Sequence, residues 1–167
     1  MRIGRPLSLA LMLVLGACGQ QATDTEPAAE AQPQTSSLPT AESAQPQMLP
    51  RQPAPEGATS YLISPAEGDV VNSPVRVVFG LKGISIAPAG INLPATGHHH
   101  LLVDTEILSL DFPIPADNNH LHYGLGQTET IVDLEPGEHQ LQLLLGDYLH
   151  IPHNPPVMSE VVTIHVE

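Results

Sequence analysis

The sequence has no tryptophan, one cysteine and very few basic side chains. Aromatic residues make up 3% of the 167 residues, so any folded core must be built mainly from Val, Leu and Ile. Lys and Arg number 5 against 18 Asp and Glu, which gives a formal net charge of −13. A chain of this sign repels nucleic acid and anionic lipid headgroups and attracts cations. We therefore expect no nucleic-acid partner.

The single cysteine, Cys18, follows a segment with the features of a signal peptide. Arg2 and Arg5 supply positive charge, and residues 7–17 (LSLALMLVLGA) form an apolar run that is too short to span a bilayer. The last residues before the cysteine, in LGAC, resemble the bacterial lipobox, whose cysteine is lipidated after the signal is cut off. We expect a lipoprotein signal peptide at residues 1–17 and a lipid on Cys18. A plain secretory signal is the alternative.

The residues after the cysteine bear on where such a lipoprotein would lie. In the lipobox pattern an aspartate after the cysteine tends to retain the protein in the inner membrane, whereas here Gly19 and Gln20 follow. We expect an outer-membrane lipoprotein of the bacterial cell envelope that faces the periplasm, with the lipid on Cys18 as its membrane contact.

The rest of the chain divides into a linker and a folded region. Residues 18–59 are rich in Pro, Ala, Gln, Ser and Thr and contain almost nothing large and apolar, so we expect a disordered tether there. From residue 60 to residue 167, short alternating runs are separated by turns that contain proline or glycine. We expect one domain in this region and a monomer.

The alternating runs predict strands and give no sign of helices. In residues 73–83 (SPVRVVFGLKG), Val75, Val77 and Phe79 fall on one face, as a period of two residues requires. Similar patterns occur in residues 138–147 (EHQLQLLLGD) and 159–167 (SEVVTIHVE). About seven short strands with regular turns predict an all-β fold, an immunoglobulin-like β-sandwich.

Seven of the nine histidines fall into three clusters. The first is His98-His99-His100 and begins a predicted strand, on which His98 and His100 would share one face while His99 points the other way. The other two clusters are HLH, which contains His120 and His122, and HIPH, which contains His150 and His153. HLH fits an extended backbone, whereas the prolines in and after HIPH predict a loop.

These clusters are candidate metal ligands. Neutral imidazole binds Cu, Zn and other transition metals, and two to four ligands must converge to form a site. A sandwich can bring neighbouring strands and loops together, with Asp104 and Asp147 as further carboxylate ligands or as acceptors that orient a ring. Thiolate is unavailable if Cys18 is lipidated, so Cu(II) or Zn is the expected metal. The predicted ligands are His98, His100, His120, His122, His150 and His153.

Two other interpretations remain open. Histidines near turns often satisfy backbone carbonyls, so the domain could be a cell-envelope interaction module with structural histidines and no metal. A small metalloenzyme is the third hypothesis, although the serines have no nucleophile-elbow context and no glycine-rich phosphate loop precedes a helix. We therefore expect no enzymatic activity and name no catalytic residue.

Four segments of the sequence occur in the order TGHHHLLVD, HLHYGLGQTET, EPGEHQLQLLLGD and HIPHNPPVMSEVVTIHV. Together they resemble the bacterial domain-of-unknown-function family 4399 (DUF4399) over about residues 78–166. The family consists of short exported domains of unestablished role, so the resemblance implies export and one β-rich domain. The sequence departs from the family pattern at Leu149, where a polar residue is expected. Matching positions include Gly97, His98, His99, His100, Asp104, His120, His122, Tyr123, Gly124, Gln127, Thr128, Glu129, Gly137, His139, Gly146, Asp147, His150, Pro152, His153, Pro155 and Pro156.

Overall fold

The alternating apolar residues of the C-terminal region form nine strands in two sheets. The computed structural model describes residues 49–167. The predicted signal peptide, Cys18 and most of the predicted tether lie outside the described residues.

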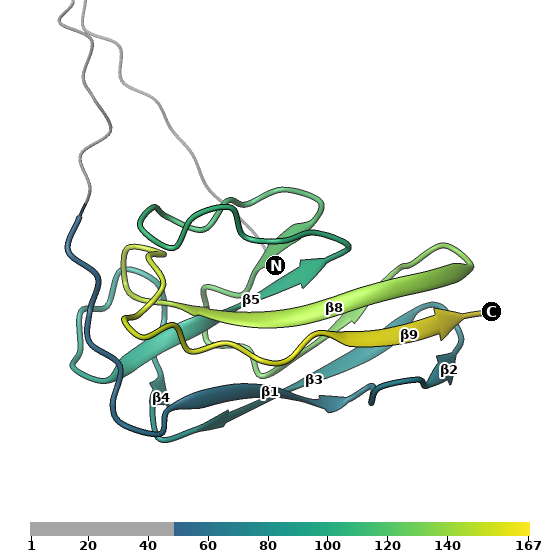
Figure 1. Ribbon diagram of the computed structural model, residues 1–167, viewed down its shortest axis with the longest axis horizontal. Coiled ribbons are helices and arrows are strands. Elements are labelled where there is room, and N and C mark those ends of the chain that lie inside the picture. The colour runs from purple at the N-terminus through teal and green to yellow at the C-terminus, as the bar shows by residue number, and fades with distance from the viewer. Residues whose placement is uncertain (1–48) are drawn as a thin grey trace, which may run out of the picture. The chain divides into compact units, whose positions relative to one another are not determined.

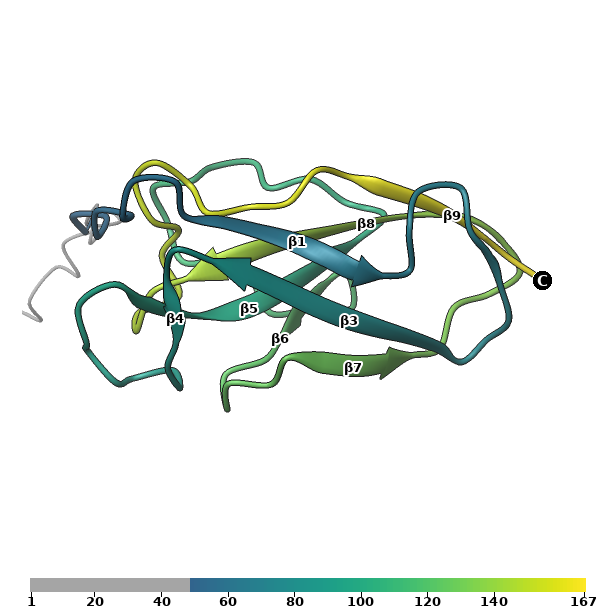
Figure 2. The ribbon, with the colours of Figure 1, turned by 90° about the horizontal axis from the view of Figure 1, so that it is seen from below.

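The smaller sheet has three antiparallel strands in the order β1-β3-β7. Figure 2 shows the three strands side by side on the near side of the molecule. Their bounds are β1 Thr59–Ser64, β3 Val75–Lys82 and β7 Glu129–Val132.

The larger sheet has six strands in the order β2-β9-β8-β5-β4, with β6 also paired to β5. Its long strands are antiparallel, whereas the short β2 and β4 join β9 and β5 in parallel. The bounds are β2 Val70–Val71, β4 Ser85–Ile86, β5 Thr96–Val103, β6 His120–His122, β8 Gly137–Gly146 and β9 Val162–Val166.

The predicted all-β, immunoglobulin-like sandwich is confirmed, with one correction to the number of strands. Residues 49–167 form nine strands where about seven were expected. The difference comes from β2 and β4, which have two residues each, because the alternation of apolar and polar residues cannot be recognised over two positions. No helix occurs among residues 49–167, and so none there is long and apolar enough to cross a membrane.

The main core lies between the two sheets. Val75, Val77 and Phe79 of β3 face inward and meet Leu141 and Leu143 of β8, as the alternation predicts. Each fully buried aliphatic side chain contributes about 1.5–3 kcal/mol relative to an exposed one. Since tryptophan is absent, this cluster of medium-sized side chains is what holds the two sheets together.

A second, smaller apolar cluster covers the opposite face of the larger sheet. Leu102 of β5 and Leu144 of β8 pack there against Ile114, which lies in the long loop between β5 and β6. Figure 1 shows this loop and the loop after β8 above the larger sheet, on the side away from β1 and β3. The larger sheet is therefore covered on both faces around β5, all of whose residues after Thr96 are buried.

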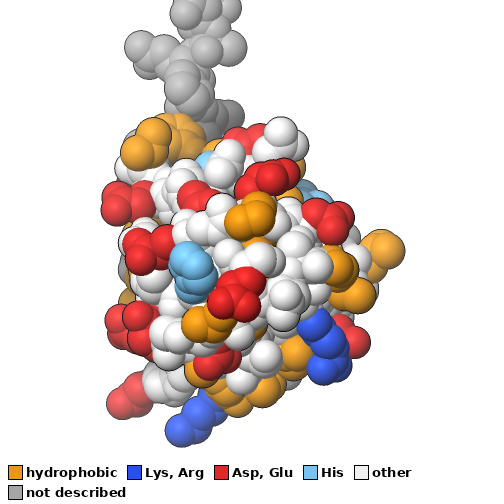
Figure 3. Space-filling view, turned by 90° about the vertical axis from the view of Figure 1, so that its right-hand side faces the viewer, with side chains coloured by type: hydrophobic (Ala, Val, Ile, Leu, Met, Phe, Trp, Pro, Cys, Tyr) orange, Lys and Arg blue, Asp and Glu red, His pale blue; other side chains and the backbone are white. Residues whose placement is uncertain are grey.

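The outer surface is predominantly acidic, in keeping with the composition. The face drawn in Figure 3 carries scattered carboxylates and exposed apolar side chains, with the basic groups near its lower edge. A surface of this kind concentrates cations around the domain.

Candidate metal centre

His98 and His100 lie next to each other on the covered outer face of β5. Both side chains are 0% exposed, and their Nε2 atoms are 3.2 Å apart. On an extended strand, alternate residues are about 6.5–7 Å apart along the chain, so the two rings lean toward each other. Their ring centroids are separated by 5.0 Å. The predicted arrangement of the His98-His99-His100 triplet is confirmed, because the His99 side chain points to the opposite face of the sheet.

His122 joins this pair from the neighbouring strand. The register of β5 and β6 places His122 directly opposite His100, and its ring centroid lies 5.0 Å from those of both His98 and His100. His122 is exposed, whereas the other two are buried. One ligand atom from each of the three histidines can be chosen so that all lie within 4.8 Å of one another.

His150 completes a cluster of four rings, which we call the histidine cluster (His98, His100, His122 and His150). Its ring centroid is 4.9 Å from that of His98, 4.8 Å from that of His122 and 5.9 Å from that of His100. The cluster thus combines two residues of β5, one of β6 and one of the loop after β8.

The loop that carries His150 is a tight turn organised by Asp147. This buried carboxylate accepts hydrogen bonds from the backbone N–H groups of Leu149 at 2.8 Å and Ile151 at 3.0 Å. His150 takes a left-handed backbone conformation with φ of 68°, which is uncommon for a residue other than glycine. Asp147 therefore acts on His150 through the backbone, by holding the turn closed.

Two glycines leave the space that the rings occupy. A Cβ on Gly146, which pairs with His98 across the sheet, would lie 3.1 Å from Nε2 of His100. A Cβ on Gly124 would lie 2.4 Å from Nε2 of His122. A side chain at Gly124 would therefore displace the His122 ring from the cluster.

Three of the rings, those of His98, His100 and His122, are held unprotonated at neutral pH. Burial is the main cause that lowers the pKa of His98 to about 4 and that of His100 to about 2, and the neighbouring histidines lower both further. Burial also lowers the pKa of His122, with His150 as a second cause. A neutral imidazole has a free lone pair, so protons compete little for these nitrogens at pH 7.

Several nitrogens of these buried rings have no hydrogen-bond partner. Nδ1 of His98 and Nδ1 of His100 are orphaned in this way. A buried polar atom without a partner costs about 1–3 kcal/mol. The orientation of the two rings therefore comes from the hydrogen-bond contact between their Nε2 atoms and from packing against the glycines, with no carboxylate or carbonyl fixing Nδ1.

His99 occupies the main core on the other side of β5. Its ring centroid lies 5.1 Å from that of Phe79, and neither ring nitrogen has a hydrogen-bond partner. Burial lowers the pKa of His99 to about 4. It is a core side chain, separated from the histidine cluster by the thickness of the sheet.

The structure places two of the six predicted ligands outside the histidine cluster. His120 lies further along β6, and its Nδ1 is 2.9 Å from Oδ1 of Asp117, an interaction that lowers the pKa of this carboxyl group. His153 is buried, and its Nε2 lies 3.1 Å from the carbonyl oxygen of Thr96, to which it donates in the matching tautomer.

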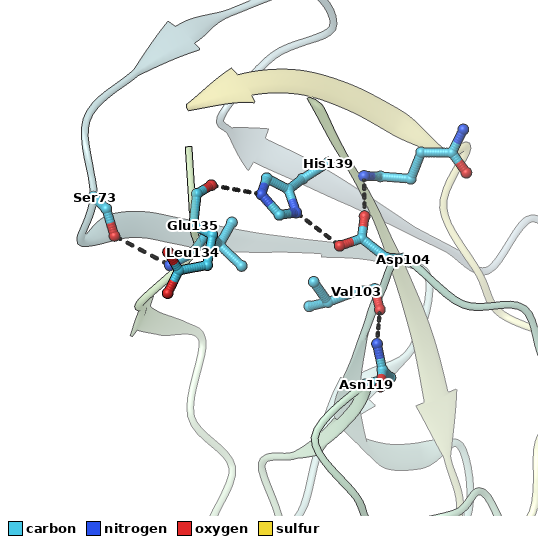
Figure 4. Close-up of polar contacts among 8 residues, drawn as sticks. Ser73, Val103, Asp104, Asn119, Leu134, Glu135 and His139 are labelled. Atoms are coloured by element: carbon cyan, nitrogen blue, oxygen red, sulfur yellow. Dashed lines mark hydrogen bonds and ion pairs between the residues drawn. The ribbon is translucent and has the colours of Figure 1, made fainter. Parts of the chain in front are cut away.

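Asp104, one of the two carboxylates considered as ligands, is engaged elsewhere. Its Oδ2 lies 2.7 Å from Nδ1 of His139, and its Oδ1 accepts a hydrogen bond from the Gln140 N–H (Figure 4). Nε2 of His139 lies 2.8 Å from the carbonyl oxygen of Glu135. Partial burial lowers the pKa of His139, but these two contacts raise it overall. The Asp104–His139 pair joins the end of β5 to the start of β8, and so has a structural role.

Residues 77–167 match the family described as "Domain of unknown function (DUF4399)". The chain belongs to this family. The resemblance that the four sequence motifs indicated is thus confirmed over almost the same range. All four members of the histidine cluster, the two glycines beside them and Asp147 lie inside the DUF4399 region.

No curated protein matches the chain. Among solved structures it is similar to the fibronectin(III)-like modules of Clostridium thermocellum CbhA, with 12% sequence identity and a TM-score of 0.30. That likeness covers 65% of this chain and 93% of the other.

The DUF4399 motifs indicated most of the site but not the function of its glycines. Gly124 and Gly146 matched the family pattern, yet the sequence gives no reason for them until the rings beside them are seen. Leu149, where the family pattern was expected to have a polar residue, contributes its backbone N–H to the Asp147 turn. Its side chain is 38% exposed and is not part of the histidine cluster.

The buried, neutral state of His99 predicts a specific pH dependence for the metal-free chain. Its pKa is about 4 in the fold and near its ordinary value of 6.5 when unfolded, so only the unfolded state gains this proton between those values. The free energy of unfolding should therefore fall as the pH is lowered from 6.5 to 4. In His99→Leu that fall should be smaller by about 1.4 kcal/mol per pH unit.

At pH 7 the same variant should be at least as stable as the wild type, because leucine removes two orphaned nitrogens. Urea unfolding at pH 7 and pH 5 measures both effects. An unchanged pH dependence would show that His99 is not held neutral in the core.

Proposed function

We propose that the domain binds a divalent transition metal ion, Cu(II) or Zn, through His98, His100, His122 and His150. The observation that carries this proposal is the convergence of candidate ligand atoms from His98, His100 and His122 within 4.8 Å. Zn–N bonds of 2.0–2.1 Å in a tetrahedral site place neighbouring nitrogens about 3.3 Å apart. The separation of 3.2 Å between Nε2 of His98 and Nε2 of His100 fits that spacing.

The chemistry of the cluster supports the same conclusion. A fold that only needed to fill this space would use apolar side chains, since buried imidazole nitrogens without partners are destabilising. The four imidazole rings offer a set of nitrogen ligands suited to Zn and Cu(II). The acidic surface adds long-range attraction for a cation.

A buffer or carrier role is supported by the uneven exposure of the ligands. His98 and His100 are buried, whereas His122 is exposed. An exposed ligand can leave and return without disrupting the sheet, so a metal ion can exchange through it. We therefore propose that the domain binds and releases the metal ion reversibly and does not turn over a substrate.

We also propose that the chain is exported and anchored in the outer membrane by a lipid on Cys18. The positive residues Arg2 and Arg5, the apolar run and the LGAC motif support this. More than one acyl chain is needed for stable anchoring, and a lipobox cysteine receives enough of them. The domain would then hold its metal in the periplasm.

Removing one buried ligand should nearly abolish metal binding. The full wild-type chain should bind one Zn or Cu(II) ion with a Kd of about 1 μM or tighter. His100→Ala should weaken binding by at least about 100-fold, beyond the 10- to 100-fold effect typical of outer-shell partners. Isothermal titration and the metal-induced rise in melting temperature measure this, since a ligand that binds only the folded state stabilises it.

Two variants serve as controls for that loss. His120→Ala removes a histidine of the same strand pair outside the cluster, and its affinity should stay within about twofold of the wild type. Gly124→Ala keeps every histidine but displaces His122, so it should weaken binding. Absence of binding and of thermal stabilisation in the wild type would contradict the metal proposal.

The lipid proposal predicts the behaviour of Cys18→Ala. In a bacterial host the wild-type chain should incorporate labelled palmitate and sediment with outer membranes. Cys18→Ala should lose the label and the lipid anchor. Gly19→Asp should keep the label but move to the inner membrane, which separates lipidation from sorting. Label on Cys18→Ala equal to that on the wild type would refute the assignment.

A further inference from the structure

Residues 51–54, which lie ahead of the first strand, form a clasp on the loop that carries His150. The N–H of Ala54 donates to the carbonyl oxygen of Asn154 at 3.0 Å, and the N–H of Asn154 donates to the carbonyl oxygen of Gln52 at 2.8 Å. A parallel bridge between Pro53 and Asn154 lies between these two bonds. Residues 51–54 thus run alongside the C-terminal part of the loop that carries His150.

Arg51 is the charged anchor of the clasp. Its Nε donates to the carbonyl oxygen of Pro152 at 3.0 Å, and its Nη2 donates to the carbonyl oxygen of His153. Its Nη1 lies 3.7 Å from Oδ1 of Asp111, in the loop between β5 and β6. The side chain is only 16% exposed, so water competes little for these contacts. One guanidinium group therefore joins both loops that cover the larger sheet.

These contacts fix the His150 turn at the end opposite Asp147. Asp147 closes the turn before His150, and Arg51 holds the two residues that follow Ile151. Between them, the carbonyl oxygen of His150 accepts a hydrogen bond from the N–H of Ile114 at 2.8 Å. The left-handed backbone of His150 is unfavourable for a residue other than glycine, so the turn keeps this shape only while its surroundings hold it.

We propose that Arg51 is a positioning residue for the metal site. Through the clasp it holds the His150 ring against His98 and His122, and so sets the affinity of the site for its metal. This inference rests on the proposed function and adds a means of regulation to it. By linkage, a bound metal tightens the clasp, and a partner that displaces the clasp weakens metal binding by the same factor.

The test compares the full wild-type chain with Arg51→Gln, Arg51→Lys and Arg76→Gln. Arg76 lies on β3 in the other sheet and pairs with Glu129 at the surface, so its variant removes the same charge away from the site. Arg51→Gln should bind Zn about 10- to 100-fold more weakly, the range typical of outer-shell partners. Arg51→Lys should fall between, since an ammonium group cannot serve the same set of acceptors at once.

Two spectroscopic measurements separate positioning from general destabilisation. Pulsed electron paramagnetic resonance of the Cu(II) form should show one coordinated imidazole fewer in Arg51→Gln than in the wild type. Hydrogen exchange of the metal-free chain should be faster at the amides of Ile114 and Ile151 in Arg51→Gln. Arg76→Gln should match the wild type in affinity, imidazole count and amide exchange.

The outcomes distinguish this inference from the proposed function. Wild-type affinity and imidazole count in Arg51→Gln would overturn the positioning role while leaving the metal site standing. If the wild type binds no metal, the proposed function fails. The role of Arg51 at a metal site then fails with it, and amide exchange at Ile114 and Ile151 tests only whether Arg51 holds the His150 turn.

Discussion

The arrangement of the domain depends on the burial of β5 on both faces. Its inward side chains, including Leu101 and Val103, join the main core, while Leu102 on the other face requires the cover of two long loops. A period of two residues then determines the place of each histidine in the triplet. His98 and His100 must lie beneath the loops, and His99 must enter the core. The same cover that buries Leu102 shields the histidine cluster and brings His150 to it.

The histidine cluster combines residues placed by the sheet with one residue placed by a loop. His98 and His100 stand on β5, which pairs with β8, β6 and β4, and β6 places His122 opposite His100 through its register. His150 instead depends on a turn that has a left-handed backbone and is held from outside by hydrogen bonds. Packing, together with the absence of side chains at two glycines, orients the rings. A metal ion bound to the facing Nε2 atoms of His98 and His100 and to His150 would connect the two parts.

Much of the fold was predictable because strand alternation is a local property. A period of two residues places Val75, Val77 and Phe79 on the inward face of their strand. It also places His98 and His100 on one face of β5 and His99 on the other. The choice among the histidine clusters was not predictable, because it depends on register and on loop conformation. His120 and His122 share a face of β6, yet only His122 lies opposite His100. In HIPH, His150 turns into the site and His153 toward Thr96, which the sequence cannot show because the Asp147 turn decides it.

X-ray absorption spectroscopy of the full chain loaded with one equivalent of Zn tests the central claim most directly. A metal ion held by the histidine cluster should show nitrogen ligands at about 2.0–2.1 Å, with the multiple scattering of four imidazoles. A first shell dominated by oxygen, with one imidazole or none, would show that the histidine cluster is not the metal site.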